Sequence, residues 1–227
     1  MILSNPLINS YFQSDLFGKF IFFTLLLLSI LTWIIFLKKL FLHKALKQGG
    51  ARFQDLFQKK SINPLSFEVA EEIPLFADLY RTLKHSTTEL LNKNQKVLLS
   101  HSDIEQLEAH MMNRVSGQVK ELEKNLFVLS TTYTLAPFLG LLGTVWGILL
   151  TFNEMQTNIA LNANSTVLGG LAMALGTTVL GLLVAIPALI TYNYLKSSIA
   201  NLSGDLEDFS YLLLTSIELH YRQIDIQ

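Results

Sequence analysis

The chain has 227 residues, of which 50% are hydrophobic and 15% are charged, and its mean hydropathy is +0.38. Soluble domains carry about 25% charged residues, so this composition indicates a membrane protein with a modest soluble part. The net charge of -1 gives no electrostatic basis for nucleic-acid binding, and the sequence has no cysteine for disulfides, thiolate chemistry or cysteine-based metal sites.

The first long apolar segment covers residues 20–37, and its sequence, FIFFTLLLLSILTWIIFL, contains no charged residue. At about 1.5 Å per residue it is long enough to cross the hydrocarbon core of a bilayer. A signal peptide is the alternative interpretation. Lys19 is the only cation before the segment, Lys38 and Lys39 follow it, and no small-residue cleavage pattern comes after it. We therefore expect an uncleaved membrane anchor.

Two further apolar segments cover residues 126–152 and 167–195, and neither contains Asp, Glu, Lys, Arg or His. Both exceed the roughly 20 residues that a membrane span requires, so each is expected to tilt or to project beyond the hydrocarbon. The link between them, residues 153–166, is polar and contains one charged residue, Glu154. The sequence thus predicts three spans.

The basic residues predict the orientation of these spans. Residues 1–19 contain only Lys19, the link 153–166 contains no Lys or Arg, and the stretch 38–125 contains most of the basic residues of the chain. Basic loops stay on the cytoplasmic side. We therefore expect residues 1–19 and 153–166 in the periplasm, and residues 38–125 and the tail 196–227 in the cytoplasm.

The stretch 38–125 has a mostly helical pattern, which Asn63-Pro64 and Ile73-Pro74 interrupt. A helix of mixed charge is expected from Leu75, and a second, charged helix from about residue 102 to 124. The second helix leads into span two, with Gly117 as its only breaker. Five apolar residues of the first helix could form a buried stripe: Leu83, Leu90, Leu91, Val97 and Leu98.

Together these elements predict an all-α integral membrane protein with three transmembrane helices, the N-terminus outside and the C-terminus inside. Helices two and three are expected to extend into a cytoplasmic helical bundle. The tail 196–227 should continue span three as a helix, because its apolar residues recur at helical spacing: Leu202, Leu206, Phe209 and Leu213.

Nothing in the sequence predicts an enzyme. It contains no nucleotide-binding loop, no nucleophile elbow and no pair of carboxylates in an apolar setting. The five histidines are scattered along the chain: His43, His85, His101, His110 and His220. We therefore expect no catalytic residue, no metal site and no cofactor.

Spans two and three each carry a stripe of small residues at three- and four-residue steps. In span two these are Ala136, Gly140, Gly143, Thr144, Gly147 and Thr151; in span three they are Gly170, Ala174, Thr177, Thr178, Gly181 and Ala185. Small residues let helices approach closely in a membrane, and threonines can bond to a carbonyl of the preceding turn. The stripes could therefore form a tight helix pair, or line a narrow interior for another helix or a file of water.

Each of the two spans also contains a proline, Pro137 in span two and Pro187 in span three. A proline within a helix leaves a carbonyl without its usual donor and can kink the helix, which membrane helices tolerate when neighbours satisfy the backbone. The prolines therefore favour the interpretation that the stripes line an interior.

The strings LAPFLGLLGTVWGIL and GLAMALGTTVLGLLVAIPALITYNYL resemble the two core spans of the TolQ/ExbB/MotA family. Its members are proton-channel subunits of energy-transducing complexes of the bacterial inner membrane. The resemblance is close over spans two and three and loose over the rest of the chain. Length, the short N-terminus and LLLLSILTWIIFLKK resemble the TolQ branch most, with ExbB close behind.

The resemblance implies a multi-pass inner-membrane protein that forms a homopentamer around the spans of partner chains. These partners are single-span proteins of the TolR or ExbD kind, which carry an aspartate in the membrane, and a TolA- or TonB-like protein is a further expected contact. The pore threonines of the family correspond to Thr144 and Thr178, with Thr177 beside them, and its prolines to Pro137 and Pro187.

One position departs from the family pattern. TolQ and ExbB have a glutamate in span three, in a string like GIAEAL, where this chain has GLAMAL and Met173. Hydroxyl groups do not hold a charge near neutral pH, so a proton path through these spans needs a titratable group from a partner. The expected function is a TolQ-like motor subunit that couples the proton motive force to envelope processes.

Other functions stay open from the sequence. An ExbB-like energiser of outer-membrane uptake is the nearest alternative, and Met173 also fits a scaffold that no longer conducts. A flagellar stator subunit of the MotA kind usually has four spans, against three here. The stripe of hydroxyls suits protons or sodium ions.

Overall fold

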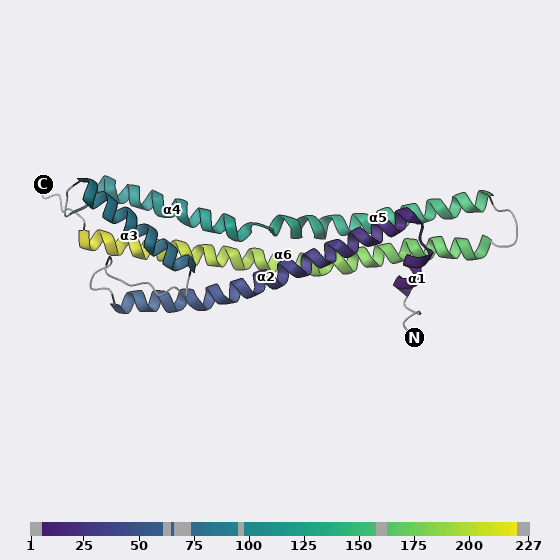
Figure 1. Cartoon of the computed structure of the whole chain (residues 1–227), viewed down its shortest axis with the longest axis horizontal. Coiled ribbons are helices and arrows are strands. Elements are labelled where there is room, and N and C mark those ends of the chain that lie inside the picture. The colour runs from purple at the N-terminus through teal and green to yellow at the C-terminus, as the bar shows by residue number, and fades with distance from the viewer. Residues whose placement is uncertain (1–5, 61–64, 66–73, 95–97, 158–162, 222–227) are drawn as a thin grey trace. The chain divides into compact units, whose positions relative to one another are not determined.

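The computed structural model describes residues 6–60, 65, 74–94, 98–157 and 163–221. Over these residues the chain is helical and has no strand (Figure 1). Its helices are α1 (Pro6–Gln13), α2 (Leu16–Lys60), α3 (Pro74–Asn94), α4 (His101–Glu123), α5 (Leu126–Thr157) and α6 (Ala163–Tyr221). In the described part of the chain, three stretches are long and apolar enough to cross a membrane, within Leu16–Lys39, His101–Asn153 and Val167–Tyr221. The all-α fold with three membrane helices is therefore confirmed.

The helices form two compact units. Unit 1 contains Met1–Lys38 and Asn125–Leu195, and unit 2 contains Lys39–Lys124 and Lys196–Gln227. Helices α2 and α6 contribute to both units. At about 1.5 Å per residue, the 59 residues of α6 far exceed the length of a membrane span, so α6 reaches beyond the hydrocarbon.

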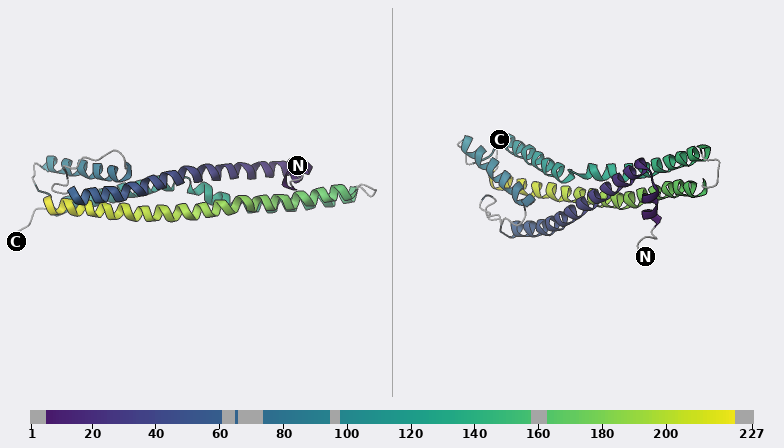
Figure 2. Two further views of the ribbon diagram at one scale, coloured as in Figure 1. Left: turned by 90° about the horizontal axis from the view of Figure 1, so that it is seen from below. Right: turned by 45° about the vertical axis from the view of Figure 1, so that its right-hand side comes forward.

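The core of unit 1 lies where its three long helices meet. Ile21 and Leu25 of α2, Ala136 of α5, and Val184 and Ala185 of α6 form one buried cluster. Figures 1 and 2 show α5 and α6 running side by side with the first half of α2 across them. Alanine at two of these five positions, 136 and 185, lets the helices approach closely.

Large apolar side chains also cover much of the outside of unit 1. The most exposed on the three helices include Phe20, Phe23, Phe138, Leu149, Leu175 and Ile190. A water-soluble monomer rarely exposes so many large apolar groups together. Lipid or other protein chains must therefore cover this surface.

A short helix that the sequence reasoning did not predict precedes the first span. Helix α1 begins at Pro6, a residue favoured at the first helical position. It packs against α6 through Ser10, whose Oγ donates a hydrogen bond to the Ala172 carbonyl oxygen at 3.0 Å. Gly176 makes room for it, because a Cβ atom at position 176 would lie 2.9 Å from Ser10 Oγ.

The helix expected to lead from residue 102 into span two is interrupted, so the prediction that Gly117 is its only breaker is wrong. Gly117 lies inside α4, which ends at Glu123, and Asn125 adopts a φ of 83° before α5 begins. Asparagine tolerates this left-handed conformation better than most residues. Lys39 Nζ donates a hydrogen bond of 2.6 Å to the carbonyl of Leu122, which satisfies one group at the end of α4.

The core of unit 2 contains apolar residues of α3, α4 and the last part of α6, such as Phe76, Met111 and Phe209. The stripe predicted on α3 is only partly correct. Leu83 is buried, but Leu90 and Leu91 are half-buried and Leu98 is 40% exposed. The buried face of α3 instead contains Phe76, Leu79, Tyr80, Leu83 and Thr87.

Several sequence expectations fall on residues that the structure does not describe. These are the turn at Asn63-Pro64, Val97, the middle of the link 153–166 and the last residues of the tail. Pro74, in contrast, is the first residue of α3, where a proline is well tolerated.

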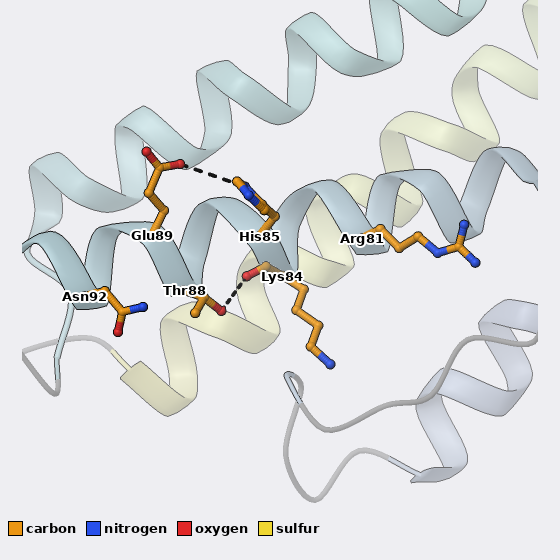
Figure 3. Close-up of a pocket in the computed structure, with 6 residues that line it drawn as sticks. All are labelled: Arg81, Lys84, His85, Thr88, Glu89 and Asn92. Carbon is orange, nitrogen blue, oxygen red and sulfur yellow. Dashed lines mark hydrogen bonds and ion pairs between the residues drawn. The ribbon is translucent and has the colours of Figure 1, made fainter.

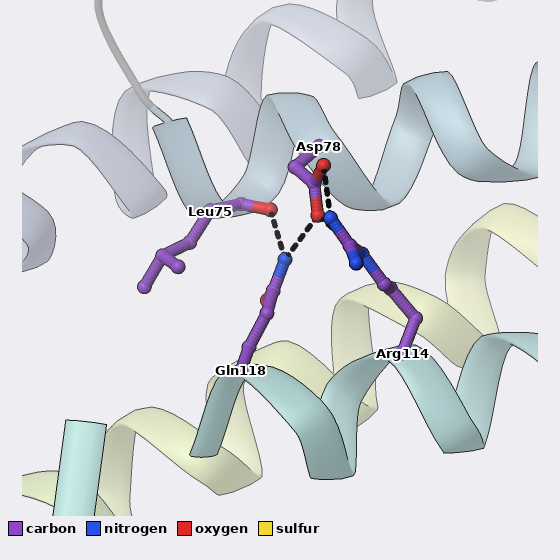
Figure 4. A network of polar contacts seen from close by, with 4 residues as sticks. All are labelled: Leu75, Asp78, Arg114 and Gln118. Atoms are coloured by element: carbon purple, nitrogen blue, oxygen red, sulfur yellow. Dashed lines mark hydrogen bonds and ion pairs between the residues drawn. The ribbon is translucent and has the colours of Figure 1, made fainter. Parts of the chain in front are cut away.

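A polar network joins α3 to α4 (Figure 4). Arg114 Nε and Nη2 each donate a hydrogen bond of 2.7 Å to one carboxylate oxygen of Asp78. Gln118 Nε2 donates to Asp78 Oδ2 at 2.6 Å and to the Leu75 carbonyl at 3.3 Å. Such two-point contact between a guanidinium and a carboxylate fixes the register of the two helices.

This network predicts a pH-dependent stability. The hydrogen bonds from Arg114 lower the pKa of Asp78, so the carboxylate is harder to protonate in the folded protein. Its contribution is complete above the unfolded pKa of about 4 and is lost as the pH falls through the folded pKa. Asp78→Asn should cost about 1 kcal/mol at neutral pH, because the pair is partly exposed. Between pH 7 and pH 3, the melting temperatures of wild type and Asp78→Asn should converge. A difference in melting temperature that stays constant over this range would contradict the prediction. Asp205→Asn, a change at an exposed aspartate, serves as the control.

A buried hydroxyl of α3 predicts a stabilising substitution. Thr87 is fully buried, and its Oγ1 has no hydrogen-bond partner among the residues that the structure describes. Thr87→Val keeps the shape and removes the unsatisfied group, so it should raise the free energy of unfolding by about 1 kcal/mol. Thr88→Val is the matched control, since Thr88 is exposed and bonds to the Lys84 carbonyl at 2.7 Å. Equal effects of the two variants in thermal melts would contradict the explanation.

Candidate functional site

The glycine stripes of α5 and α6 face each other within one chain. A Cβ atom at Gly140 would lie 3.0 Å from the Thr177 carbonyl oxygen and 3.0 Å from Thr178 Cα. A Cβ atom at Gly181 would lie 2.7 Å from the Ala136 carbonyl oxygen. Around Gly140 and Gly181 the backbones of α5 and α6 are therefore in direct contact, as small residues permit in a membrane.

The same contact continues along both helices. A Cβ atom at Gly143 would overlap the side chain of Thr177, and one at Gly170 would overlap Thr151 Oγ1. A Cβ atom at Gly147 would lie 2.8 Å from the Gly170 carbonyl oxygen. These glycines thus lie where α5 and α6 pack closely against each other. A tight helix pair is one of the two interpretations that the sequence left open.

Thr177 and Thr178 are neighbours in sequence but differ in their surroundings. Thr177 is fully buried, and its Oγ1 donates toward the carbonyls of Ala174 at 2.9 Å, Met173 at 3.2 Å and Gly140 at 3.3 Å. Thr178 is half-buried, and its Oγ1 lies 3.3 Å from the Ala174 carbonyl and 3.4 Å from the Gly140 carbonyl. Thr177 is enclosed in the helix pair, whereas the hydroxyl of Thr178 is weakly held and partly accessible.

Thr144 lies on a different side of α5 from the glycines. Its Oγ1 donates a hydrogen bond of 2.6 Å to the Leu141 carbonyl, and the residue is half-buried. Gly143 and Gly147 face α6, and each helical step turns by about 100°, so Thr144 points away from the centre of the α5–α6 contact. The structure therefore places Thr144 and Thr178 where another chain could reach them.

The two prolines lie inside continuous helices. Helix α5 passes through Pro137 and α6 passes through Pro187 without a break. Both prolines are half-buried, and Tyr133 and Tyr192, which lie near them in sequence, bring their ring centroids to 5.3 Å of each other. The kinks expected at these prolines stay a prediction.

A carboxylate that sequence reasoning missed lies at the start of α2. Asp15 Oδ1 accepts a hydrogen bond from the Gly18 backbone N–H, and its Oδ2 accepts one from Trp146 Nε1, both at 2.9 Å. The sequence signal for the first contact was an aspartate directly before an apolar helix, which is a preferred N-cap. No local pattern signals the second contact, because 131 positions separate the two residues.

Comparison with known proteins identifies the family. Residues 82–208 match the model of the MotA/TolQ/ExbB proton channel family. The chain belongs to this family. The match includes α5 and the part of α6 that carries Thr177 and Thr178.

Similar proteins of this family are named ExbB. The chain is 31% identical to the biopolymer transport protein ExbB of Pseudomonas putida over 93% of its own length and 64% of that protein. It is 50% identical to ExbB of Aquifex aeolicus over 34% of its length and 51% of that protein. It is 28% identical to ExbB of Neisseria meningitidis serogroup A over 90% and 91% of the two chains. The chain therefore spans about half to two thirds of the first two relatives.

Family membership and the three apolar helices together make this a multi-pass protein of the inner membrane. The family consists of proton-channel subunits. The relatives carry the name ExbB, which was the alternative in the sequence analysis, rather than TolQ.

Met173 occupies the position where the resemblance to TolQ and ExbB implies a glutamate. The side chain is 1% exposed and lies against α2, where a Cβ atom at Gly18 would overlap Met173 Cε. Thus the group at position 173 faces the first turn of α2 in this chain. A thioether there packs and does not titrate.

Two surface hollows that described residues of unit 2 line lack the features of an active site. One is lined by Arg81, Lys84, His85, Thr88, Glu89 and Asn92 of α3, and His85 Nδ1 lies 3.8 Å from Glu89 (Figure 3). The other, of about 200 Å³, lies between α3 and α4, where Ser86 Oγ and His110 Nδ1 are 3.3 Å apart. Since Glu89 pairs with His85, no described carboxylate orients His110 as a general base would require.

Proposed function

We propose that this chain is the ExbB-like channel subunit of an inner-membrane motor driven by the proton motive force. Family membership and the ExbB names of the similar proteins support this over the TolQ-like role. In this proposal the chain forms a homo-oligomer, a pentamer by resemblance. The oligomer surrounds single-span partners of the ExbD or TolR kind, which pass the work on to a TonB- or TolA-like protein.

One observation carries the mechanism. Spans two and three contain hydroxyl groups but no acid or base, and Met173 is buried where relatives are expected to have a glutamate. A proton that crosses hydrocarbon needs a group that can hold it, so the titratable group must come from the partner. The partner's membrane aspartate would alternate between its protonated and ionised forms beside Thr144 and Thr178. Their hydroxyls would solvate the carboxylate.

Proton flux in liposomes tests this proposal. The chain, co-purified with its single-span partner, should conduct protons, and an Asp→Asn change in the membrane segment of the partner should abolish the flux. Met173→Leu is the matched control, since it keeps an apolar side chain of similar size. Absence of flux in wild type that Met173→Glu restores would instead make this subunit a scaffold that has lost its own acid.

A further inference from the structure

The first turn of α2 contacts both other membrane helices at one place. Asp15 caps α2 through Gly18 and, with its second oxygen, binds the indole N–H of Trp146 on α5. Phe17 packs on the same indole, with ring centroids 4.6 Å apart and an interplanar angle of 52°. Gly18 leaves the space that Met173 of α6 fills. These contacts lie within unit 1.

The indole of Trp146 is therefore held at two points, by a hydrogen bond at its nitrogen and by ring packing. A tryptophan held in this way cannot turn without losing one of the two contacts. The bond joins the indole N–H of Trp146 to a side-chain oxygen of Asp15 at 2.9 Å. This hydrogen bond therefore links α2 to α5 at one specific place.

The position of Trp146 on α5 connects this hydrogen bond to Thr144, one of the two threonines that the proposed function places beside the partner's aspartate. Successive residues of a helix turn by about 100°, so Trp146 lies roughly 60° to one side of Gly143, and Thr144 about 100° to the other. Gly143 faces α6, and Trp146 faces α2. Together the glycine contact and the Trp146 contact fix the rotation of α5 about its axis, and hence the direction of Thr144.

We propose that Asp15 is a positioning residue for the proton path: by holding Trp146 it sets the rotation of α5 and so aims Thr144 at the partner. The importance of that direction rests on the proposed function. In this proposal Asp15 acts only through Trp146 and the rotation of α5. Its role differs from that of an ordinary helix cap, because the oxygen that binds Trp146 is not the one that caps α2.

A cysteine placed at position 144 reports this rotation directly. The sequence has no cysteine, so Thr144→Cys gives a single thiol whose reaction rate with a maleimide can be measured in native membranes. Asp15→Ser keeps a good N-cap but is too short to cap α2 and hold the indole as well. Trp146→Phe removes the N–H and keeps a ring. Ile190→Cys, 65% exposed on α6, is the control thiol.

We expect Asp15→Ser and Trp146→Phe each to change the labelling rate at position 144 by roughly tenfold, and the double variant to change it no further, as for two residues that act through one contact. The rate at position 190 should stay constant. An unchanged rate at position 144 in Asp15→Ser would overturn the proposal, as would a Trp146→Phe variant that matches wild type while Asp15→Ser does not.

Flux measurements separate this proposal from the proposed function. Where wild type conducts, Asp15→Ser and Trp146→Phe should reduce the flux by the same factor. A wild type that does not conduct with its partner would contradict the proposed function alone, and the labelling rates would still decide whether Asp15 positions Thr144.

Discussion

Gly181→Ala should destabilise the membrane unit, although alanine is the better helix former. The new Cβ atom would lie 2.7 Å from the Ala136 carbonyl oxygen and 3.2 Å from Gly140 Cα, which are backbone atoms that cannot turn away. Forcing α5 and α6 apart should lower the free energy of unfolding by about 1–3 kcal/mol. The higher helix propensity of alanine offsets about 1 kcal/mol of this or less. We therefore expect a lower melting temperature in detergent and less folded protein in the membrane.

Gly204→Ala and Gly117→Ala are matched controls for this prediction. Both glycines lie inside helices of unit 2, and apart from the neighbouring backbone of its own helix, a Cβ atom at either would meet no atom of the described residues within 4 Å. Each substitution should raise the free energy of unfolding by about 0.5–1 kcal/mol, through helix propensity alone. A Gly181→Ala variant as stable as these controls would mean that α5 and α6 separate at no cost.

Much of the fold could be predicted because membrane helices obey strong local rules. Charge-free segments of about 18 residues or more identify spans, and helical periodicity predicted the helices that became α3 and α4. The interruption at Asn125 could not be predicted in this way, because asparagine does not require a left-handed conformation. What stabilises it is Lys39, which is distant in sequence and bonds to the freed carbonyl of Leu122.

The candidate site, too, could be predicted from the sequence only in part. The small-residue stripes were visible in the sequence, because the spacing of glycines on one helix is a local property. Which threonine is enclosed and which is accessible was not visible, since Thr177 and Thr178 are adjacent and only the packing of α5 distinguishes them. Likewise, the bond between Asp15 and Trp146 depends on how α2 crosses α5.

Thr178→Val should abolish or strongly reduce proton flux through the assembled channel, whereas Thr177→Val should not. Valine keeps the shape of threonine and removes its hydroxyl. Among the described residues, the hydroxyl of Thr178 has contacts of 3.3 and 3.4 Å, so under the proposed function it is free to turn toward a partner's carboxylate. Its loss removes a hydrogen bond to a charged group, worth roughly 1.5–3 kcal/mol, which corresponds to a tenfold or larger reduction in rate.

Thr177→Val is the matched control for Thr178→Val. Its hydroxyl is enclosed between α5 and α6 and reaches the carbonyls of Met173, Ala174 and Gly140. Its removal should lower the stability by about 1 kcal/mol, the net value of a typical hydrogen bond, and leave the flux per folded complex near wild type. Flux and melting temperature, measured on the same preparations, separate the two effects. If Thr178→Val conducts at the wild-type rate, its hydroxyl does not solvate the moving charge, and Thr144, which is also half-buried, becomes the next candidate.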